Sequence, residues 1–260
     1  MYREACDVDE TMYQQFVEAA TVTVPVDKAT YWDGWDIYST VRSYANEGKR
    51  SWTLEYSLVG YLINNLIFCG QEDEPGIRYD SCPTTEECGF AKGSANAFWA
   101  MASTYFGKQA KGHVRVFLNS NREGGAFQIN ESYFAQYELV NMPPAEVDTV
   151  NIYLVTDLEK QFGDNCSSPS IESFRDILNR RQLNYQCFDQ PRDVLHLLCV
   201  DGNGSSDCVL KQDVQHSRTT EVAPQTTASA RSLHEQRWSW FLFLASTAFA
   251  VCIPSFPRLS

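Results

Sequence analysis

Basic residues are scarce in this chain. Its 260 residues include 21 Lys and Arg against 33 Asp and Glu, which gives a formal net charge of −12. This balance argues against binding of nucleic acid, because phosphate contacts require clustered cations. An anionic substrate would need local hydrogen-bond donors to overcome the negative field of the protein.

The sequence also lacks the common motifs for nucleotides and metals. No G-x-G-x-x-G follows a predicted strand and no P-loop is present, which excludes the usual phosphate cradles. No Cys-x-x-Cys occurs, and none of the cysteine spacings forms a zinc pattern. We therefore expect no metal site, and no internal repeat is visible.

Cysteine, by contrast, is abundant. The nine cysteines are Cys6, Cys69, Cys82, Cys88, Cys166, Cys187, Cys199, Cys208 and Cys252. Three N-glycosylation sequons accompany them, at Asn130, Asn165 and Asn203. Scattered cysteines together with three sequons favour an oxidising, extracytoplasmic setting. The alternative is a cytosolic protein with free buried thiols.

The C-terminal region has the composition of a GPI-attachment signal. The polar linker 213–229 and the polar residues after it precede the apolar run WSWFLFLASTAFAVCIPSF. Small residues, a polar linker and an apolar tail form that signal, so we expect attachment at Ser229, with Ala228 and Ala230 as alternatives, and removal of 230–260. The alternative is a transmembrane helix, against which the short tail and its two prolines argue. Removal takes Cys252 with it and leaves eight cysteines, an even number, as a disulfide framework requires.

The N-terminus shows no matching entry signal. The opening residues MYREACDVDE have no basic start followed by an apolar run, so no signal peptide is recognised. A GPI-attachment signal without a secretory signal peptide in the same chain is inconsistent. We therefore expect the full product to carry further residues upstream.

Hydrophobic periodicity predicts a series of helices and strands. The predicted helices cover 9–20, 36–46, 53–68, 94–110 and 170–182, the last opened by a capping Ser. The predicted strands cover 113–119, 135–140, 150–156, 184–188 and 194–200, and the predicted loops cover 25–35 and 69–90. A helix-rich front half and an alternating back half indicate two subdomains in one α/β architecture, with a cleft between them.

Four segments, taken together, resemble one protein family. They are YANEGKRSWTLEYSLVGYLINNLIFCGQ (44–71), SCPTTEECG with SANAFWAMAS (81–103), SYFAQYELVN (132–141) and LNYQCFDQPRDVLHLLCVDGNGSSDC (183–208). The order T-L-E-x-x-L-x-G-Y, C-G and F-W-x-x-x-S is much more specific than any single motif. On these residues the chain resembles the ADP-ribosyl cyclase/NAD+ glycohydrolase family, ectoenzymes that split NAD+ and can make cyclic ADP-ribose.

The resemblance implies an α/β fold that is stapled by disulfides. A helix-rich N-terminal subdomain would comprise about 1–26 and 53–110. The other subdomain, about 27–52 and 111–212, would hold a mainly parallel four-stranded sheet flanked by helices, with the active-site cleft between the two. The implied cysteine pairs are Cys6–Cys88, Cys69–Cys82, Cys166–Cys187 and Cys199–Cys208.

Glu138 stands out within the apolar segment SYFAQYELVNM, because a glutamate is rarely buried unless something pairs with it or uses it. By resemblance Glu138 is the catalytic glutamate beneath the ribose, where it binds the hydroxyls or forms a covalent adduct. Nicotinamide is a cation in NAD+ and leaves neutral, so it needs no general acid. One carboxylate therefore suffices, where ordinary glycosidases use two. The alternative from the segment alone is an edge-strand glutamate in water.

The resemblance also implies which residues hold nicotinamide. Aromatic rings would grip the faces of the cationic ring. Trp99 in AFWAMAS is one of them, and Trp32 in YWDGW is the other, with Trp35 as the alternative to Trp32. Glu55 would bind the carboxamide and help to decide between cyclisation and hydrolysis. An acid in the first turn of a helix is the alternative explanation for Glu55.

Three more positions follow from the same resemblance. Asn64 falls near the carboxamide, and Ser103, one turn after the stacking Trp, falls near the substrate phosphates. Tyr133 lies five residues before Glu138, where an aromatic ring that packs on a folded adenine would favour cyclisation. An exposed helical Ser is the alternative for Ser103.

We therefore expect an extracellular NAD+ glycohydrolase that makes mainly ADP-ribose, with less cyclic ADP-ribose, base exchange on NADP+ and a link to calcium signalling. NAD+ and NADP+ would be substrates, so no cofactor is expected, and the GPI anchor would hold the enzyme on the outer face of the plasma membrane. One alternative is a catalytically silent surface receptor on the same scaffold. Another is an unrelated secreted glycosidase, which would need a second carboxylate such as Glu131 near Glu138.

Overall fold

The computed structural model of the chain describes a defined set of residues. They are 6–47, 49–64, 66, 69–70, 77–78, 82–89, 92–158, 160–201 and 208. The chain divides into two units, Met1–Arg218 and Thr219–Ser260, and all the described residues belong to the first unit. The expected linker 213–229, Ser229, the C-terminal signal and the sequon at Asn203 lie outside the described residues.

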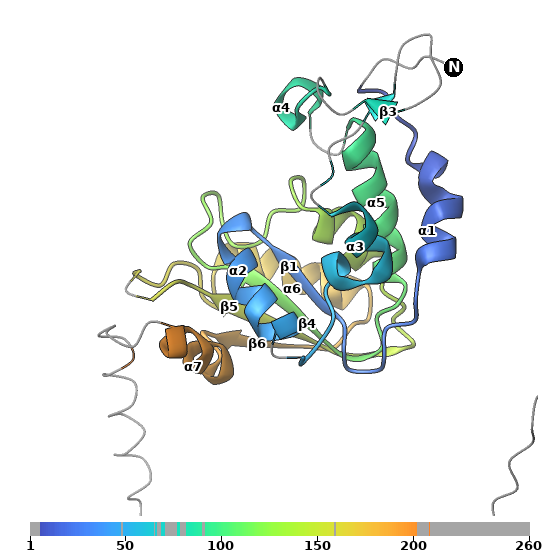
Figure 1. Cartoon of the computed structure of the whole chain (residues 1–260). Coiled ribbons are helices and arrows are strands. Elements are labelled where there is room, and N and C mark those ends of the chain that lie inside the picture. The colour runs from blue at the N-terminus through green and yellow to red at the C-terminus, as the bar shows by residue number, and fades with distance from the viewer. Residues whose placement is uncertain are drawn as a thin grey trace, which may run out of the picture. The chain divides into compact units, whose positions relative to one another are not determined.

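A four-stranded parallel sheet forms the centre of the first unit (Figure 1). Across the sheet the strands are β1 (Thr30–Asp33), β4 (Gly112–Asn119), β5 (Val147–Val155) and β6 (Tyr185–Asp189). Each neighbouring pair is parallel. Such a sheet must be covered on both faces, and apolar side chains of β4 are buried on both. The predicted fold class is confirmed.

Two clusters of apolar side chains lie on the two faces of the sheet. One cluster joins Phe117 of β4 to α2 (Tyr38–Arg42), the π-helical turn η3 (Ser43–Glu47) and α7 (Arg192–Asp201). The larger cluster joins the opposite face of β4 to α5 (Ser94–Gly107) and α6 (Pro169–Arg180). The strands are therefore buried between helices, and their carboxyl ends remain free to carry functional residues.

Helices from the first half of the chain lie together beside the sheet (Figure 1). The short 3₁₀ helix η1 (Glu10–Tyr13), capped by Asp9, leads into α1 (Gln14–Ala20), which packs against α5. α3 (Leu58–Ile63) contacts α1 and follows the 3₁₀ turn η4 (Leu54–Tyr56). The division of the first unit into two subdomains stays a prediction.

The helix predicted over 53–68 is interrupted. Ser57 has an extended backbone with φ −71° and ψ 161°, and its hydroxyl accepts the Gly60 N–H at 3.3 Å as the N-cap of α3. A capping Ser offers the helix a new start, which separates η4 from α3. The remaining short elements are η2 (Trp35–Ile37), β2 (Cys69–Gly70), β3 (Ile77–Arg78) and α4 (Thr85–Cys88).

Four predictions of secondary structure are wrong, and one is the predicted loop 69–90, which contains β2, β3 and α4. Residues 135–140 are not a strand but the π-helical turn η5 (Phe134–Glu138) followed by the 3₁₀ turn η6 (Leu139–Asn141). Residues 194–200 are not a strand but belong to α7, and 25–35 is not a loop throughout, because it contains β1. In the segments 135–140 and 194–200 the buried side chains are grouped at helical spacing, which the aromatic and β-branched content alone does not reveal.

The start of α6 also differs from the prediction. The helix begins at Pro169 with Ser168 at the N-cap, whose side chain makes no capping hydrogen bond. The hydroxyl of Ser170 donates instead to Asp164 at 2.5 Å. Pro at the first helical position has its φ already set for the helix, which explains the boundary.

All four disulfides implied by the resemblance are present: Cys6–Cys88, Cys69–Cys82, Cys166–Cys187 and Cys199–Cys208. The first closes the longest loop, with a sequence separation of 82 residues, and holds the N-terminal segment near α4. Restriction of the unfolded chain makes such links stabilising by typically ~2–4 kcal/mol each. Within the described residues, no helix combines the length and the apolar character needed to cross a membrane.

Candidate active site

Glu138 is buried where α5 meets the turn η5, with 6 % of its surface exposed. Gly107 of α5 permits this approach, because a Cβ at that position would lie 2.9 Å from the Glu138 Cα, which is too close for packed atoms. The hydroxyl of Ser103, one turn earlier on α5, donates a hydrogen bond to the Glu138 carboxyl. One helix therefore positions both the backbone and the side chain of Glu138.

The surroundings of Glu138 disfavour its negative charge. Burial raises the pKa of Glu138 well above its usual range, the charges of Glu55 and Asp33 raise it further, and the Ser103 hydrogen bond opposes these effects. Among the described residues, no ion pair involves Glu138. A positive charge that arrived beside this carboxyl would favour its ionised form.

Glu55 lies in η4, and one of its carboxylate oxygens is buried without a partner. Oε1 accepts a hydrogen bond from Trp32 Nε1 at 3.1 Å, and the Thr53 side chain also donates to the carboxylate. Oε2 has no hydrogen-bond partner within the described residues. Burial raises the pKa of Glu55. A buried oxygen left unsatisfied is costly, so Oε2 is a position where a ligand that donates a hydrogen bond would be stabilised.

Gly60 positions Glu55 as Gly107 positions Glu138. A Cβ at Gly60 would lie 2.8 Å from the Glu55 Cα, so α3 could not pack against η4 with any larger residue there. Both acids therefore depend on a close backbone contact that only glycine permits.

The structure separates the two tryptophans of YWDGW. Trp32 is half-buried in β1 and donates to Glu55, whereas Trp35 is 82 % exposed and touches Trp32 edge-on, with ring centroids 5.5 Å apart. The ring of Tyr38 lies 5.1 Å from that of Trp32, and the Asn64 side chain is hydrogen-bonded to Tyr38. This arrangement favours Trp32 as the stacking residue and brings Asn64 to the same aromatic group.

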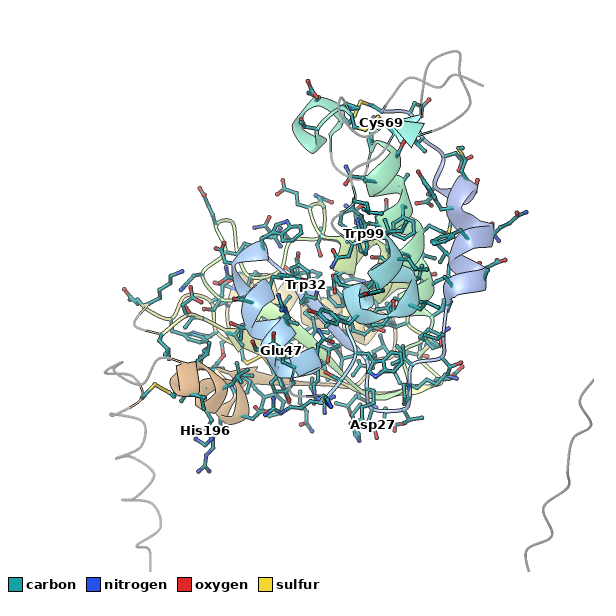
Figure 2. The ribbon with its side chains drawn as sticks, in the orientation of Figure 1. Asp27, Trp32, Glu47, Cys69, Trp99 and His196 are labelled. Atoms are coloured by element: carbon teal, nitrogen blue, oxygen red, sulfur yellow. A yellow bond between two sulfur atoms is a disulfide. The ribbon has the colours of Figure 1, made fainter. Side chains whose placement is uncertain are left out.

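Trp99 and Tyr133 lie on the α5 side of Glu138. Trp99 is half-buried on α5 (Figure 2). It lies one turn before Ser103, so the two side chains share a face of the helix. The Tyr133 hydroxyl donates to the Asn96 carbonyl of α5 at 3.4 Å, and burial raises the pKa of Tyr133. The predicted residues therefore fall into two groups, one on β1, η4 and the end of α3, and one on α5 and η5.

Sequence reasoning missed two residues of this region, Asp33 and Arg122. Asp33 follows Trp32 at the end of β1, is 9 % exposed and forms an ion pair with Arg122. Burial raises the pKa of Asp33, although Arg122 and hydrogen bonds from Ser132 and Gly34 lower it. The position of Asp33 beside a predicted stacking Trp was a usable signal, but nothing in the sequence singled out Arg122.

A hollow of about 230 Å³ on the surface is lined by neither Glu55 nor Glu138. It is lined by Asn46, Lys49, Ser51, Trp52 and Tyr56. Because Glu138 does not line it, the predicted active-site cleft between two subdomains stays a prediction.

One cluster of potential metal-binding side chains occurs among the described residues. It consists of Cys166, Cys187 and Asp189, but the two cysteines form a disulfide and so cannot act as thiolate ligands. Nothing in this cluster supports a metal centre.

Comparison with known proteins gives a consistent result. Residues 1–208 match the family model for ADP-ribosyl cyclase. An ADP-ribosyl cyclase/cyclic ADP-ribose hydrolase of Aplysia californica is 30% identical over 210 residues, 80% of this chain and 72% of that protein. The human ADP-ribosyl cyclase/cyclic ADP-ribose hydrolase 2 is 29% identical over 249 residues, 94% of this chain and 74% of that protein.

Solved structures show the same similarity. An Aplysia cyclase in complex with the substrate NGD and the product cGDPR matches with a TM-score of 0.71 and 30% identity, over 79% of each chain. Porcine CD38 with a covalent intermediate, ribo-F-ribose-5'-phosphate, matches with a TM-score of 0.65 and 29% identity, over 73% of this chain and 80% of that one. With the family model covering most of its length, this chain belongs to the ADP-ribosyl cyclase family and is an enzyme.

Proposed function

We propose that the enzyme is an extracellular NAD+ glycohydrolase that cleaves the bond between nicotinamide and ribose, with Glu138 as the catalytic residue. The observation that carries this proposal is the state of Glu138: buried, held by Ser103 and without an ion pair among the described residues. The names of the relatives and the covalent ribose intermediate bound to porcine CD38 support the same chemistry.

The substrate supplies a positive charge to Glu138, which has no ion pair among the described residues. Nicotinamide in NAD+ is a cation, so its binding beside Glu138 and Glu55 lowers the cost of their negative charges. As the bond breaks, the charge moves from the pyridinium onto the ribosyl ring. A buried carboxylate beside that ring stabilises this oxocarbenium-like transition state more than the ground state, and the neutral leaving group needs no proton.

Glu55 and the indoles orient the leaving group. The free Oε2 of Glu55 accepts an N–H of the nicotinamide carboxamide, which satisfies the buried oxygen. Trp32, fixed by its hydrogen bond to Glu55, and Trp99 hold the faces of the ring, and stacking of a cation on Trp contributes roughly 0.5–2 kcal/mol.

The second half of the reaction divides between two nucleophiles. Water gives ADP-ribose, and the adenine N1 of a folded substrate gives cyclic ADP-ribose. We propose that water dominates, with a smaller cyclic product, and that other bases exchange with nicotinamide on NADP+. Tyr133, whose hydroxyl donates to the Asn96 carbonyl of α5, is the residue that we propose influences how the adenine folds back.

The compartment belongs to the proposal as well. Four disulfides and the exposed residues Asn130 and Asn165 suit a glycosylated protein outside the cytosol. We propose a GPI anchor at Ser229 on the composition of the C-terminal region alone. Release of activity from intact cells by a phosphatidylinositol-specific phospholipase tests the anchor, and retention of all activity on the cells would contradict it.

A fluorescent etheno-NAD+ assay tests the function itself. The expected result is a rise in fluorescence with wild-type protein, and chromatography of the NAD+ products should show mainly ADP-ribose. No turnover at any enzyme concentration would favour the alternative, a silent surface receptor. Cleavage of glycosides but not of NAD+ would favour the unrelated glycosidase.

A further inference from the structure

The proposed substrate creates an electrostatic problem that Ser103, the residue expected near its phosphates, does not solve, because Ser103 carries no charge and its hydroxyl donates to Glu138. NAD+ carries two phosphates, whereas the region around Glu138 contains the further acids Glu55 and Asp33, in a chain of formal charge −12. Phosphates that enter such a field need a cation or a set of hydrogen-bond donors beside them.

Arg122 is a cation placed at this point of the fold. It lies in the loop just after β4, which ends at Asn119, and its partner Asp33 ends β1, the strand paired with β4. The carboxyl ends of neighbouring parallel strands are where open α/β sheets bind their ligands. Arg122 therefore lies at the edge of the sheet from which Trp32 and Asp33 emerge.

The Asp33–Arg122 ion pair differs from the others among the described residues. Its side chains are 11 % and 18 % exposed, whereas each side chain of the remaining pairs is at least 37 % exposed. Exposed pairs contribute little, but a charge held in a half-buried position interacts strongly with its neighbours. Asp33 is close enough to Glu138 to raise the pKa of Glu138, so Arg122 is part of the same electrostatic group.

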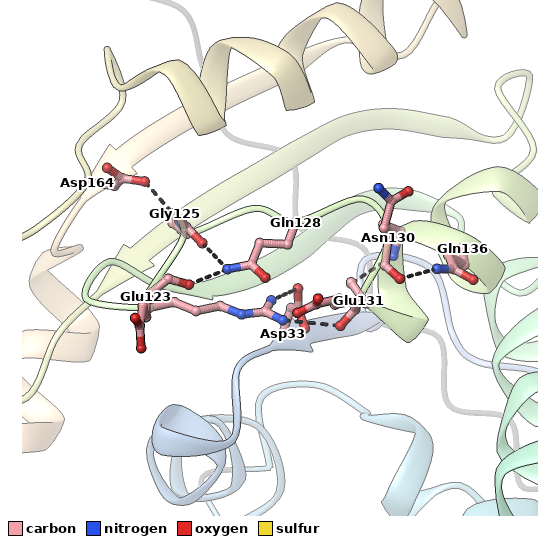
Figure 3. Close-up of polar contacts among 12 residues, drawn as sticks. Asp33, Glu123, Gly125, Gln128, Asn130, Glu131, Gln136 and Asp164 are labelled. Atoms are coloured by element: carbon pink, nitrogen blue, oxygen red, sulfur yellow. Dashed lines mark hydrogen bonds and ion pairs between the residues drawn. The ribbon is translucent and has the colours of Figure 1, made fainter. Parts of the chain in front are cut away.

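The guanidinium of Arg122 is held in place by two hydrogen bonds, which engage only part of its N–H groups. Nη1 donates to Asp33, and Nη2 donates to the Glu131 carbonyl at 3.1 Å, as the dashed lines to Asp33 and Glu131 in Figure 3 show. Gln128 donates to the Gly125 carbonyl at 3.2 Å, which helps to order the loop that carries Arg122. These two contacts account for two of the five N–H groups of an arginine, and such a fork suits phosphate oxygens.

We propose that Arg122 binds the diphosphate of the substrate and that Asp33 positions its guanidinium for this contact. The inference rests on the proposed function. Arg122 thereby makes the enzyme specific for nucleotides that carry phosphate, whereas Trp32, Trp99, Glu55 and Glu138 act on the nicotinamide riboside portion that is common to all substrates.

Two substrates with the same scissile bond test this assignment. NAD+ carries the diphosphate and nicotinamide riboside carries none. Arg122→Gln should raise KM for NAD+ by about ten-fold or more and leave kcat/KM for nicotinamide riboside within about two-fold. Arg122→Lys should recover part of the loss on NAD+. The matched control Arg180→Gln, an exposed arginine in the last turn of α6, should change neither substrate.

Four outcomes are decisive. An equal loss of kcat/KM on both substrates in Arg122→Gln would show that Arg122 only holds the loop to β1. An unchanged KM for NAD+ would show that Arg122 does not bind phosphate. Either result overturns the proposal. Binding of ADP-ribose and of adenosine, measured by calorimetry, tests the contact without turnover, and only the affinity for ADP-ribose should fall in Arg122→Gln. If wild-type protein binds ADP-ribose through Arg122 but cleaves no substrate, the proposed function fails while the assignment of Arg122 stands.

Discussion

Gly107 lies against the backbone of Glu138 so closely that a Cβ would sit 2.9 Å from the Glu138 Cα. The contact joins α5 to η5, the turn that carries the proposed catalytic residue. The same helix supplies Ser103, the hydrogen-bond donor to the Glu138 carboxyl. The absence of a side chain at Gly107 and the hydroxyl of Ser103 together set the position of Glu138.

Gly107→Ala should therefore displace Glu138. We expect kcat to fall by at least about ten-fold, since an error of about 1 Å in a catalytic group is enough for large losses, and overpacking should cost ~1–3 kcal/mol of stability. Steady-state kinetics and urea unfolding measure the two effects. Lys108→Ala, at the exposed end of the same helix, is the control. Unchanged kcat in a folded Gly107→Ala protein would show that the contact does not position Glu138.

The raised pKa of Glu138 predicts a pH dependence of stability. In the unfolded chain a glutamate titrates at roughly 4.3, and the folded protein holds its proton to higher pH. The stability from the protonated form is complete below the unfolded pKa and is lost as pH rises from there through the folded pKa. Across that window the free energy of unfolding of wild-type protein should fall relative to that of Glu138→Gln, measured by urea unfolding. Parallel curves for the two proteins would contradict the assignment.

The same pKa predicts the acid limb of activity. In the free enzyme the neutral form of Glu138 persists above the usual range of a glutamate, so kcat/KM should decline on acidification at a higher pH than an exposed carboxylate would give. Once the cationic substrate is bound, the pKa of Glu138 falls, and kcat should decline only at lower pH. Profiles of both constants against pH measure the difference, and identical acid limbs would oppose it.

Trp32 and Trp35 should behave differently on substitution. Trp32→Phe removes the indole N–H from Glu55 Oε1, so we expect KM for NAD+ to rise about five-fold or more and the product ratio to shift. Trp35→Phe changes a ring that is 82 % exposed, and it should alter KM by less than about two-fold. Kinetics with product chromatography compares the two variants. The reverse order of effects would assign the stacking role to Trp35.

Much of the fold could be predicted, and the errors have physical causes. The parallel sheet and the four disulfides are as the family resemblance implies, whereas the sequence alone leaves the pairing of eight cysteines open. The aromatic content of the Glu138 segment favours a strand, whereas packing on α5 makes the segment a π-helical turn. Such irregular helices are frequent at functional sites and leave little trace in the sequence.

The site was predictable only in part, for a similar reason. Glu138 could be singled out because a carboxylate among aromatic residues is unusual, and Trp32 through the family resemblance, although the role of each stays a prediction. Arg122 could not, since its role depends on the pairing of β1 with β4, which brings it to Asp33 across 89 residues of sequence. The sequence shows which residues are unusual in their surroundings, but it does not show which of them contact one another in the fold.

The most direct measurement is the rate of etheno-NAD+ cleavage by Glu138→Gln. The amide has the shape of the acid but cannot stabilise a positive ribosyl ring, so we expect kcat to fall by about 10²-fold or more, while the protein stays folded. Glu172→Gln, an exposed glutamate of α6, should keep wild-type activity. Full activity in Glu138→Gln would contradict the central claim that this carboxylate carries out the chemistry.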